Sequence, residues 1–132
     1  MTQFLLDTNH FSEIWKDRPS VTTRVRAIPA AHMAVSVPTI GELWFMVYNS
    51  RRERENRRRL TLLLRDFVVL NYDASAAIEF GRIKAELARA GQPIPDADIQ
   101  IAGIARSHGL VLLTADAHFS FIADLTCEDW MV

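Results

Sequence analysis

Short, continuous runs of apolar residues, separated by longer stretches of helical periodicity, are the feature that most constrains the fold of this 132-residue chain. A short apolar run is typical of a strand that is buried on both faces, as strands of parallel sheets are. Four such runs predict strands at residues 3–6, 33–37, 67–72 and 110–114. Because these strands alternate with helices, we expect a single α/β domain over residues 1–132, with a central, mainly parallel sheet.

The segments between the strands have apolar residues at helical spacing. They predict helices at 10–17, 20–28, 40–48, 74–90 and from 96 or 98 to about 108, with a further helix after the arginine-rich stretch. The helix at 40–48 is apolar on almost every side, which indicates a place deep in the core or at an interface. A short edge strand is expected at 126–130.

The composition excludes several classes of protein. Cys127 is the only cysteine, so the chain can form neither an intrachain disulfide nor a cysteine-based zinc site. The apolar runs are far shorter than the roughly 20 residues that span a bilayer, and the N-terminus lacks the layout of a secretion signal. We therefore expect a cytoplasmic protein without membrane association.

Isolated carboxylates stand at the edges of four apolar segments. Asp7 and Asp116 each follow a predicted strand, Glu42 lies near the start of the apolar helix, and Asp98 lies at the start of a later helix. A buried charge requires a partner, yet no lysine or arginine is close in sequence to Asp7, Glu42 or Asp116. Because sites in open parallel sheets form at the carboxyl ends of strands, we expect these side chains to meet.

A shared site requires compensation for several negative charges, because repulsion would otherwise raise the pKa of some carboxyl groups. Mg²⁺ or Mn²⁺ prefers oxygen ligands and would supply that compensation. Such an ion activates water and polarises a phosphoryl oxygen, which points to chemistry on a phosphate. The hydroxyl groups of Thr8 and Thr114 could support the ligand carboxylates, or could only satisfy backbone groups.

Each carboxylate also has a purely structural explanation. Asp7 could cap a helix, and Asp116 could close a turn after its strand. Asp98 could also be a cap, but Asp96 is better placed for that role, which leaves Asp98 without an obvious structural task. Glu42 could face solvent on its apolar helix. One shared site is a simpler explanation than four separate ones.

An arginine-rich segment, RRERENRRR, covers residues 51–59. If it is helical, its Glu/Arg pairs would form a solvated face. The alternative is a patch that contacts phosphates. The candidate residues of such a patch are Arg51, Arg52, Arg54, Arg57, Arg58 and Arg59.

Other catalytic motifs are absent from the sequence. The four histidines lack the spacing of a zinc site, and no serine lies in a GxSxG context. The glycines form neither a P-loop nor a dinucleotide fingerprint. His118 and Phe119 are expected to orient the loop after Asp116 rather than to perform acid–base chemistry.

Four motifs, taken in order, resemble those of PIN-domain ribonucleases of the VapC toxin type. They are LLDTN at 5–9, VPTIGEL at 37–43, GQPIPDADIQIAGIA at 91–105 and LLTADAHF at 112–119. LTCEDW at 125–130 resembles the last strand of that family, so the resemblance covers nearly the whole chain. Asp98 rather than Asp96 matches the D-x-x-I-A pattern of the family, and Ala115 stands where many of its members have asparagine.

The resemblance implies a three-layer α/β/α sandwich with an acidic pocket that binds Mg²⁺ or Mn²⁺. The metal-binding and catalytic residues that it implies are Asp7, Glu42, Asp98 and Asp116. It further implies an endoribonuclease toxin of a type II toxin–antitoxin pair, which cleaves RNA phosphodiesters with a metal-activated water. Such proteins form homodimers and are held inactive by a VapB-like antitoxin, for which the apolar helix at 40–48 and the arginine-rich segment after it would offer an antitoxin or dimer surface. In such an enzyme we expect the arginine-rich segment to hold the RNA backbone.

Two alternatives remain to be weighed at the level of sequence. The first is a catalytically silent PIN-like module that acts through its antitoxin complex, but such a module has no reason to keep the carboxylates. The second is a phosphatase of similar sheet topology, which requires another aspartate two residues after its nucleophile. Asn9 stands at that position after Asp7, so the sequence lacks the second carboxylate of such a phosphatase.

Overall fold

The computed structural model describes residues 2–132, which form one five-stranded sheet with helices on both faces. The strands lie in the order β3-β2-β1-β4-β5, and every neighbouring pair is parallel. Their bounds are β1 (Phe4–Leu6), β2 (Met33–Ser36), β3 (Val68–Leu70), β4 (Val111–Leu113) and β5 (Cys127–Glu128). The predicted strands are confirmed, and so is the short edge strand.

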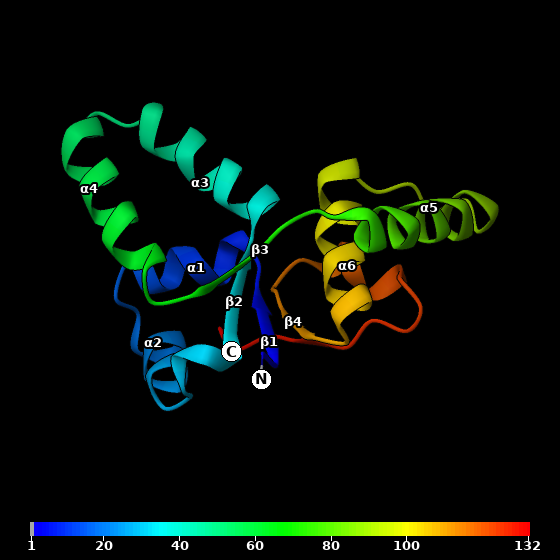
Figure 1. Cartoon of the computed structure of the whole chain (residues 1–132), viewed down its shortest axis with the longest axis horizontal. Helices are drawn as coiled ribbons and strands as arrows, with labels where there is room; N and C mark the ends of the chain where they lie inside the picture. Colours follow the sequence, from blue (N-terminus) through cyan, green and yellow to red (C-terminus); the bar gives the residue numbers. More distant parts are fainter. Residues whose placement is uncertain (1) are drawn as a thin grey trace.

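Six α-helices and two short 3₁₀ helices make up the outer layers of the described chain (Figure 1). One layer contains α1 (Thr8–Trp15), α2 (Pro19–Arg26), α3 (Val37–Tyr48) and α4 (Glu53–Leu64). The other contains α5 (Ala74–Arg89), α6 (Asp96–His108) and the 3₁₀ helix η2 (Ala117–Phe121), while η1 (Ala30–His32) precedes β2. The three-layer α/β/α architecture is therefore confirmed.

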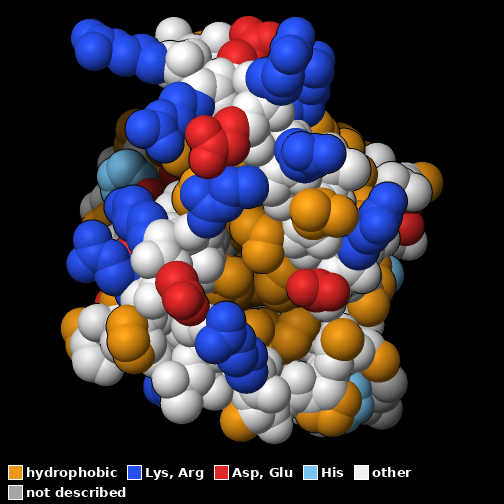
Figure 2. Space-filling view, turned by 90° about the vertical axis from the view of Figure 1, so that its left-hand side faces the viewer, with side chains coloured by type: hydrophobic (Ala, Val, Ile, Leu, Met, Phe, Trp, Pro, Cys, Tyr) orange, Lys and Arg blue, Asp and Glu red, His pale blue; other side chains and the backbone are white. Residues whose placement is uncertain are grey.

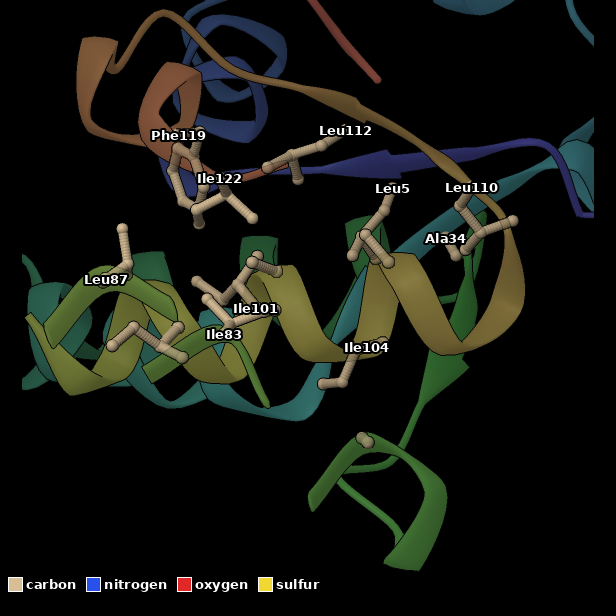
Figure 3. Close-up of a cluster of buried hydrophobic side chains, with 14 residues drawn as sticks. Leu5, Ala34, Ile83, Leu87, Ile101, Ile104, Leu110, Leu112, Phe119 and Ile122 are labelled. Atoms are coloured by element: carbon tan, nitrogen blue, oxygen red, sulfur yellow. The ribbon is translucent and has the colours of Figure 1, made fainter. Parts of the chain in front are cut away.

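The two sides of the sheet support separate hydrophobic clusters. Leu5 and Leu112 are fully buried against α5, α6 and η2 (Figure 3). Leu6 and Leu113, the next residue along each strand, are fully buried against the layer of α1 to α4. Because successive side chains of a strand point to opposite faces, a strand covered on both faces must be apolar at every position. This is why the strands appear in the sequence as continuous apolar runs.

Of the two places expected for the helix at 40–48, the deep core is contradicted, and an interface stays a prediction. In α3, Leu43 and Val47 are buried, but Phe45 is 67% exposed and Tyr48 is 58% exposed. Pro38 stands in the first turn of α3, and Ser36 caps the helix, with its Oγ accepting the Thr39 N–H at 3.3 Å. Only one face of α3 therefore contacts the core. No helix within residues 2–132 combines the length and the apolar character of a membrane span.

The order of the strands determines where a site can form. The chain passes from β1 outward to β2 and β3, and then returns to β4 on the other side of β1. The segments that follow β1 and β4 therefore lead to opposite layers of the sandwich, α1 to one and η2 to the other. In open α/β sheets, ligands bind outside the carboxyl ends of the strands at such a switch point.

Candidate active site

Polar side chains gather at the carboxyl edge of the sheet, where β1 and β4 end side by side. The Asp7 N–H donates to the Leu113 carbonyl at 2.9 Å, so the segment that follows β1 and the segment that follows β4 start side by side. Helix α3 carries Glu42 in its second turn, and α6 carries Asp98 in its first turn. Four separate segments thus contribute to one place.

Asp7 has both a structural and a site role. Its Oδ1 accepts the Thr8 N–H at 2.8 Å and so caps α1, as the structural explanation requires. Its Oδ2 accepts the Thr114 hydroxyl at 2.8 Å and the Asn9 side-chain amide at 3.3 Å. Burial raises the pKa of the Asp7 carboxyl, and the hydrogen bonds from Thr114 and Thr8 partly oppose this. The cap uses only one of the two oxygens.

The two threonines hold carboxylates in place. Thr8 Oγ1 donates to Glu42 Oε2 at 2.8 Å, which ties α1 to α3 across the site. Thr114 Oγ1 donates to Asp7 and also accepts the Asp116 N–H at 3.0 Å. Both hydroxyl groups therefore bond carboxylate oxygens, which is the supporting arrangement that the sequence left open.

Asn9 and His10 complete a network that sequence reasoning missed. Asn9 Oδ1 accepts the Ala115 N–H at 3.2 Å and lies 2.7 Å from His10 Nδ1. His10 Nε2 accepts the Trp130 N–H at 2.9 Å, so the proton of the imidazole is on Nδ1 and is donated to Asn9. His10 is fully buried, and burial lowers its pKa. The only signal in the sequence was the position of both residues directly after Asp7 and Thr8.

Asp98 and Asp116 face a common histidine. His118 Nδ1 lies 3.4 Å from Asp116 Oδ1 and 3.6 Å from Asp98 Oδ2. These three side chains each offer a ligand atom, and the atoms all lie within 4.8 Å of one another. The Asp116 carboxylate also caps η2 by accepting the His118 N–H at 2.9 Å. The loop after β4 thus presents a carboxylate and an imidazole together.

The expectation that Asp96 caps α6 is wrong. Pro95 occupies the cap position, and no side chain there accepts a hydrogen bond from the helix. Asp96 instead pairs with Lys84 of α5 at 3.0 Å, with both side chains more than half exposed. Asp98, whose side chain is 19% exposed, is the aspartate of this helix that faces the site.

The four carboxylates lie within electrostatic reach of one another. Burial raises the pKa of Asp98, and the negative charges of Asp116, Asp7 and Glu42 raise it further. Within residues 2–132, none of these four carboxylates forms an ion pair with a lysine or arginine. Among the described residues, only Asp98, Asp116 and His118 form a group of three whose ligand atoms lie within 4.8 Å of one another, while Asp7 and Glu42 act on Asp98 through their charge. Crowded oxygen donors with uncompensated charge fit a divalent cation of the kind that the motifs imply.

The arginine-rich segment lies on the turn between α3 and α4 and on α4 itself. Figure 2 shows basic side chains gathered over this part of the molecule, with acidic ones between them. An open groove of about 1050 Å³ lies here, and its lining includes Arg51, Arg52, Arg54, Arg57 and Arg58. Arg59 points elsewhere, because it donates to the Trp15 carbonyl at 2.6 Å and stacks on the Trp15 ring.

A family model described as PIN domain matches residues 4–125 of the chain. A curated relative from Shigella flexneri, "tRNA(fMet)-specific endonuclease VapC", is 36% identical, and the alignment covers 98% of this chain and 99% of the relative. "Ribonuclease VapC2" from Haemophilus influenzae is 34% identical over 99% of this chain and 100% of its own length.

Solved structures agree with these sequence matches. A DNA-bound VapBC structure from Salmonella typhimurium contains a chain with a TM-score of 0.92 and 35% identity, covering 98% of this chain and 99% of that one. A VapBC-1 structure from nontypeable Haemophilus influenzae contains one with a TM-score of 0.88 and 28% identity, covering 99% of this chain and 100% of that one. Sequence and fold are thus similar to proteins of the same kind over nearly their full length.

Proposed function

The chain belongs to the VapC-type ribonucleases of the PIN-domain family, and from this premise we propose that it cleaves RNA phosphodiester bonds at the cluster of Asp7, Glu42, Asp98 and Asp116. The observation that carries this proposal is the convergence of four carboxylates, from four separate segments, at the carboxyl edge of β1 and β4. A protein that served only as a scaffold would gain nothing from such a cluster, because each buried carboxylate costs stability.

The carboxylates would hold Mg²⁺ or Mn²⁺. When bound, such an ion supplies a Lewis acid that lowers the pKa of a coordinated water and stabilises negative charge on a phosphoryl oxygen. The residues of the chain prepare the site for it. Thr114 and Asn9 hold Asp7 in one orientation, Thr8 holds Glu42, and the Thr114 hydroxyl accepts the Asp116 N–H and so positions Asp116.

The remaining carboxylate, Asp98, is only partly buried, and His118 is the one described side chain that contacts it as an ion-pair partner. Its oxygens therefore remain free for an ion or a substrate, although the Asp116 side chain is more exposed, at 34% against 19%. The arginines on the α3–α4 turn would bind the RNA backbone away from the reacting bond, because phosphate contacts position a strand without reading its bases.

The partner of the toxin would be a VapB-like antitoxin, since the similar structures are VapBC assemblies. A groove of about 250 Å³ between α1, α3 and α4 is lined by Trp15, Leu43 and Met46 among others. An antitoxin segment with apolar side chains would fit this groove, and acidic side chains beside it would meet the arginines of α4. The exposed Phe45 and Tyr48 of α3 would contribute to a homodimer interface.

The test of the proposal compares two neighbouring aspartates of α6. Asp98→Asn should lower the rate of RNA cleavage in Mg²⁺ or Mn²⁺ by about 100-fold or more. Asp96→Asn, which removes only the exposed pair with Lys84, should cleave at close to the wild-type rate. The rate is measured on end-labelled RNA, with tRNA(fMet) as the first substrate because the Shigella relative is named for it.

Circular dichroism of both variants serves as the control for folding. A correctly folded Asp98→Asn protein that cleaves RNA at the wild-type rate would contradict the proposal. A titration of the wild-type protein with Mg²⁺ or Mn²⁺ would also distinguish an enzyme from a catalytically silent module, because these ions should not stabilise a silent module.

A further inference from the structure

The imidazole of His118 is the feature of the site that the four-carboxylate cluster does not explain. It is half exposed and stands against Asp98 and Asp116, and the Asp116 carboxylate accepts only the His118 N–H among the described residues. Asp7 already accepts three hydrogen bonds, and Glu42 accepts one from Thr8. Asp98 accepts none from any side chain other than His118 within the described residues.

We propose that His118 Nδ1 ligates the same ion as Asp98 and Asp116, and that this nitrogen makes the site prefer Mn²⁺ to Mg²⁺. The inference rests on the proposed metal-dependent function. It adds His118 to the carboxylates as a metal ligand and attributes the preference for Mn²⁺ to this residue.

The distances fit a common ion. Two donors that each lie about 2.1 Å from one ion are separated by about 3.0 Å when adjacent in an octahedron and by about 4.2 Å when opposite. His118 Nδ1 lies 3.4 Å from Asp116 Oδ1 and 3.6 Å from Asp98 Oδ2. Both separations fall between those limits, so an ion could be held with small movements of the side chains.

The local structure holds the imidazole at this place. The His118 N–H donates to Asp116 Oδ1 at 2.9 Å, which fixes the backbone of the loop relative to the carboxylate. The next residue, Phe119, is 1% exposed and packs in the cluster between the sheet and α6. Little ordering is therefore required of the histidine when an ion binds.

The chemistry of the donor set supports the preference. Mg²⁺ takes oxygen ligands almost exclusively and keeps several of its waters. Imidazole nitrogen is instead a ligand of first-row transition ions, of which Mn²⁺ binds it least tightly, and it is a poor ligand for Mg²⁺. A site with two carboxylates and one imidazole should thus bind Mn²⁺ more tightly than a site of carboxylates alone, and should gain little for Mg²⁺.

The experiment detects nitrogen coordination directly. Mn²⁺-loaded wild-type protein should show a ¹⁴N coupling of a bound imidazole in pulsed electron paramagnetic resonance, and His118→Gln should lose it. In calorimetric titrations His118→Gln should weaken Mn²⁺ binding about tenfold or more and change Mg²⁺ binding by less than about twofold. His108→Gln, at the exposed end of α6, is the matched control and should keep the coupling and both affinities.

Each contrary outcome has a separate meaning. Bound Mn²⁺ without a ¹⁴N coupling in the wild type, or with a coupling that persists in His118→Gln, would overturn the assignment of His118. If that protein still cleaves RNA, the proposed function stands without the histidine ligand. Failure of the wild type to bind either ion would overturn both proposals together.

Discussion

At the scale of single residues, most polar side chains of the site combine a structural task with a chemical one. Asp7 caps α1 and lines the site, and Asp116 caps η2 while it faces His118. His10 touches no carboxylate of the cluster. Through Asn9, His10 nonetheless connects Asp7 to the backbone of Trp130, which lies 120 residues after His10 in the sequence. The orientation of one carboxylate thus depends on contacts across the whole chain.

The burial of Asp98, together with the neighbouring carboxylates, should make the metal-free protein less stable than a variant without this charge. The pKa of Asp98 is raised above its ordinary value of 3.8, so the folded state binds a proton more readily than the unfolded state does. Stability due to this group is present below pH 3.8 and is lost as the pH rises through the raised pKa. Asp98→Asn should therefore unfold at a higher temperature than the wild type at pH 7 in EDTA.

Calorimetry across a range of pH checks this prediction. The difference between Asp98→Asn and wild type should grow from acidic to neutral pH, and added Mn²⁺ should reverse its sign by stabilising only the wild type. Asp96→Asn is the control, because its carboxylate is exposed and paired. A wild type that is more stable than Asp98→Asn at pH 7 without metal would show that the crowding has no energetic cost.

At the scale of elements, the contact between α5 and α6 supports the placement of Asp98. Helix α6 is buried along most of its length, and Gly103 lies where it crosses α5. A Cβ atom at this position would lie 2.8 Å from the Ala76 carbonyl oxygen and 3.2 Å from the Phe80 backbone nitrogen. Since both neighbours are backbone atoms of a helix, neither can move without shifting α5.

Gly103→Ala should consequently destabilise the protein by about 1–3 kcal/mol, because the two helices must separate. Gly81→Ala on α5 is the matched control. A Cβ there meets nothing within 4 Å, so alanine should stabilise the helix by about 0.5–1 kcal/mol. Urea unfolding of both variants measures the free energies. Equal midpoints for the two substitutions would mean that the helices are less tightly packed than described.

At the scale of the whole molecule, a formal net charge of −1 conceals two regions of opposite sign. The four carboxylates of the site meet at the edge of the sheet. Five arginines of the arginine-rich segment, with Glu53 and Glu55 among them, line the groove on the α3–α4 turn and α4 (Figure 2). RNA would contact the basic region while its reacting phosphate enters the acidic one. Binding and cleavage should therefore respond to different substitutions.

Arg54 and Arg58, one turn apart on α4, test the basic region. Replacing both with glutamine should weaken RNA binding and reduce the slope of log affinity against log salt by about 1.4, if each contacts one phosphate. Arg89→Gln on α5 should leave the slope unchanged. Fluorescence anisotropy in the Asp98→Asn background measures binding without cleavage. An unaltered salt slope in the double variant would assign the arginines to a solvated face.

The sequence by itself determined the elements and the end of the sheet at which a site forms. Strand runs, helix caps and apolar spacing depend on near neighbours, and parallel strands all end at one edge, so the positions of Asp7 and Asp116 followed from the pattern. The choice of Asp98 over Asp96 was also available from the D-x-x-I-A motif. Only the tertiary structure showed why Asp96 is not the residue of the site: it pairs with Lys84, which lies on a different helix.

The pairing of side chains and the exposure of α3 were decided by the tertiary structure. Thr8 meets Glu42 over 34 residues and Thr114 meets Asp7 over 107 residues, and such contacts depend on how the helices cross the sheet. For the same reason the apolar face of α3 could not be assigned to core or surface from its composition. The sequence determined which chemical groups reach the edge of the sheet, and the packing of distant elements decided which of them touch.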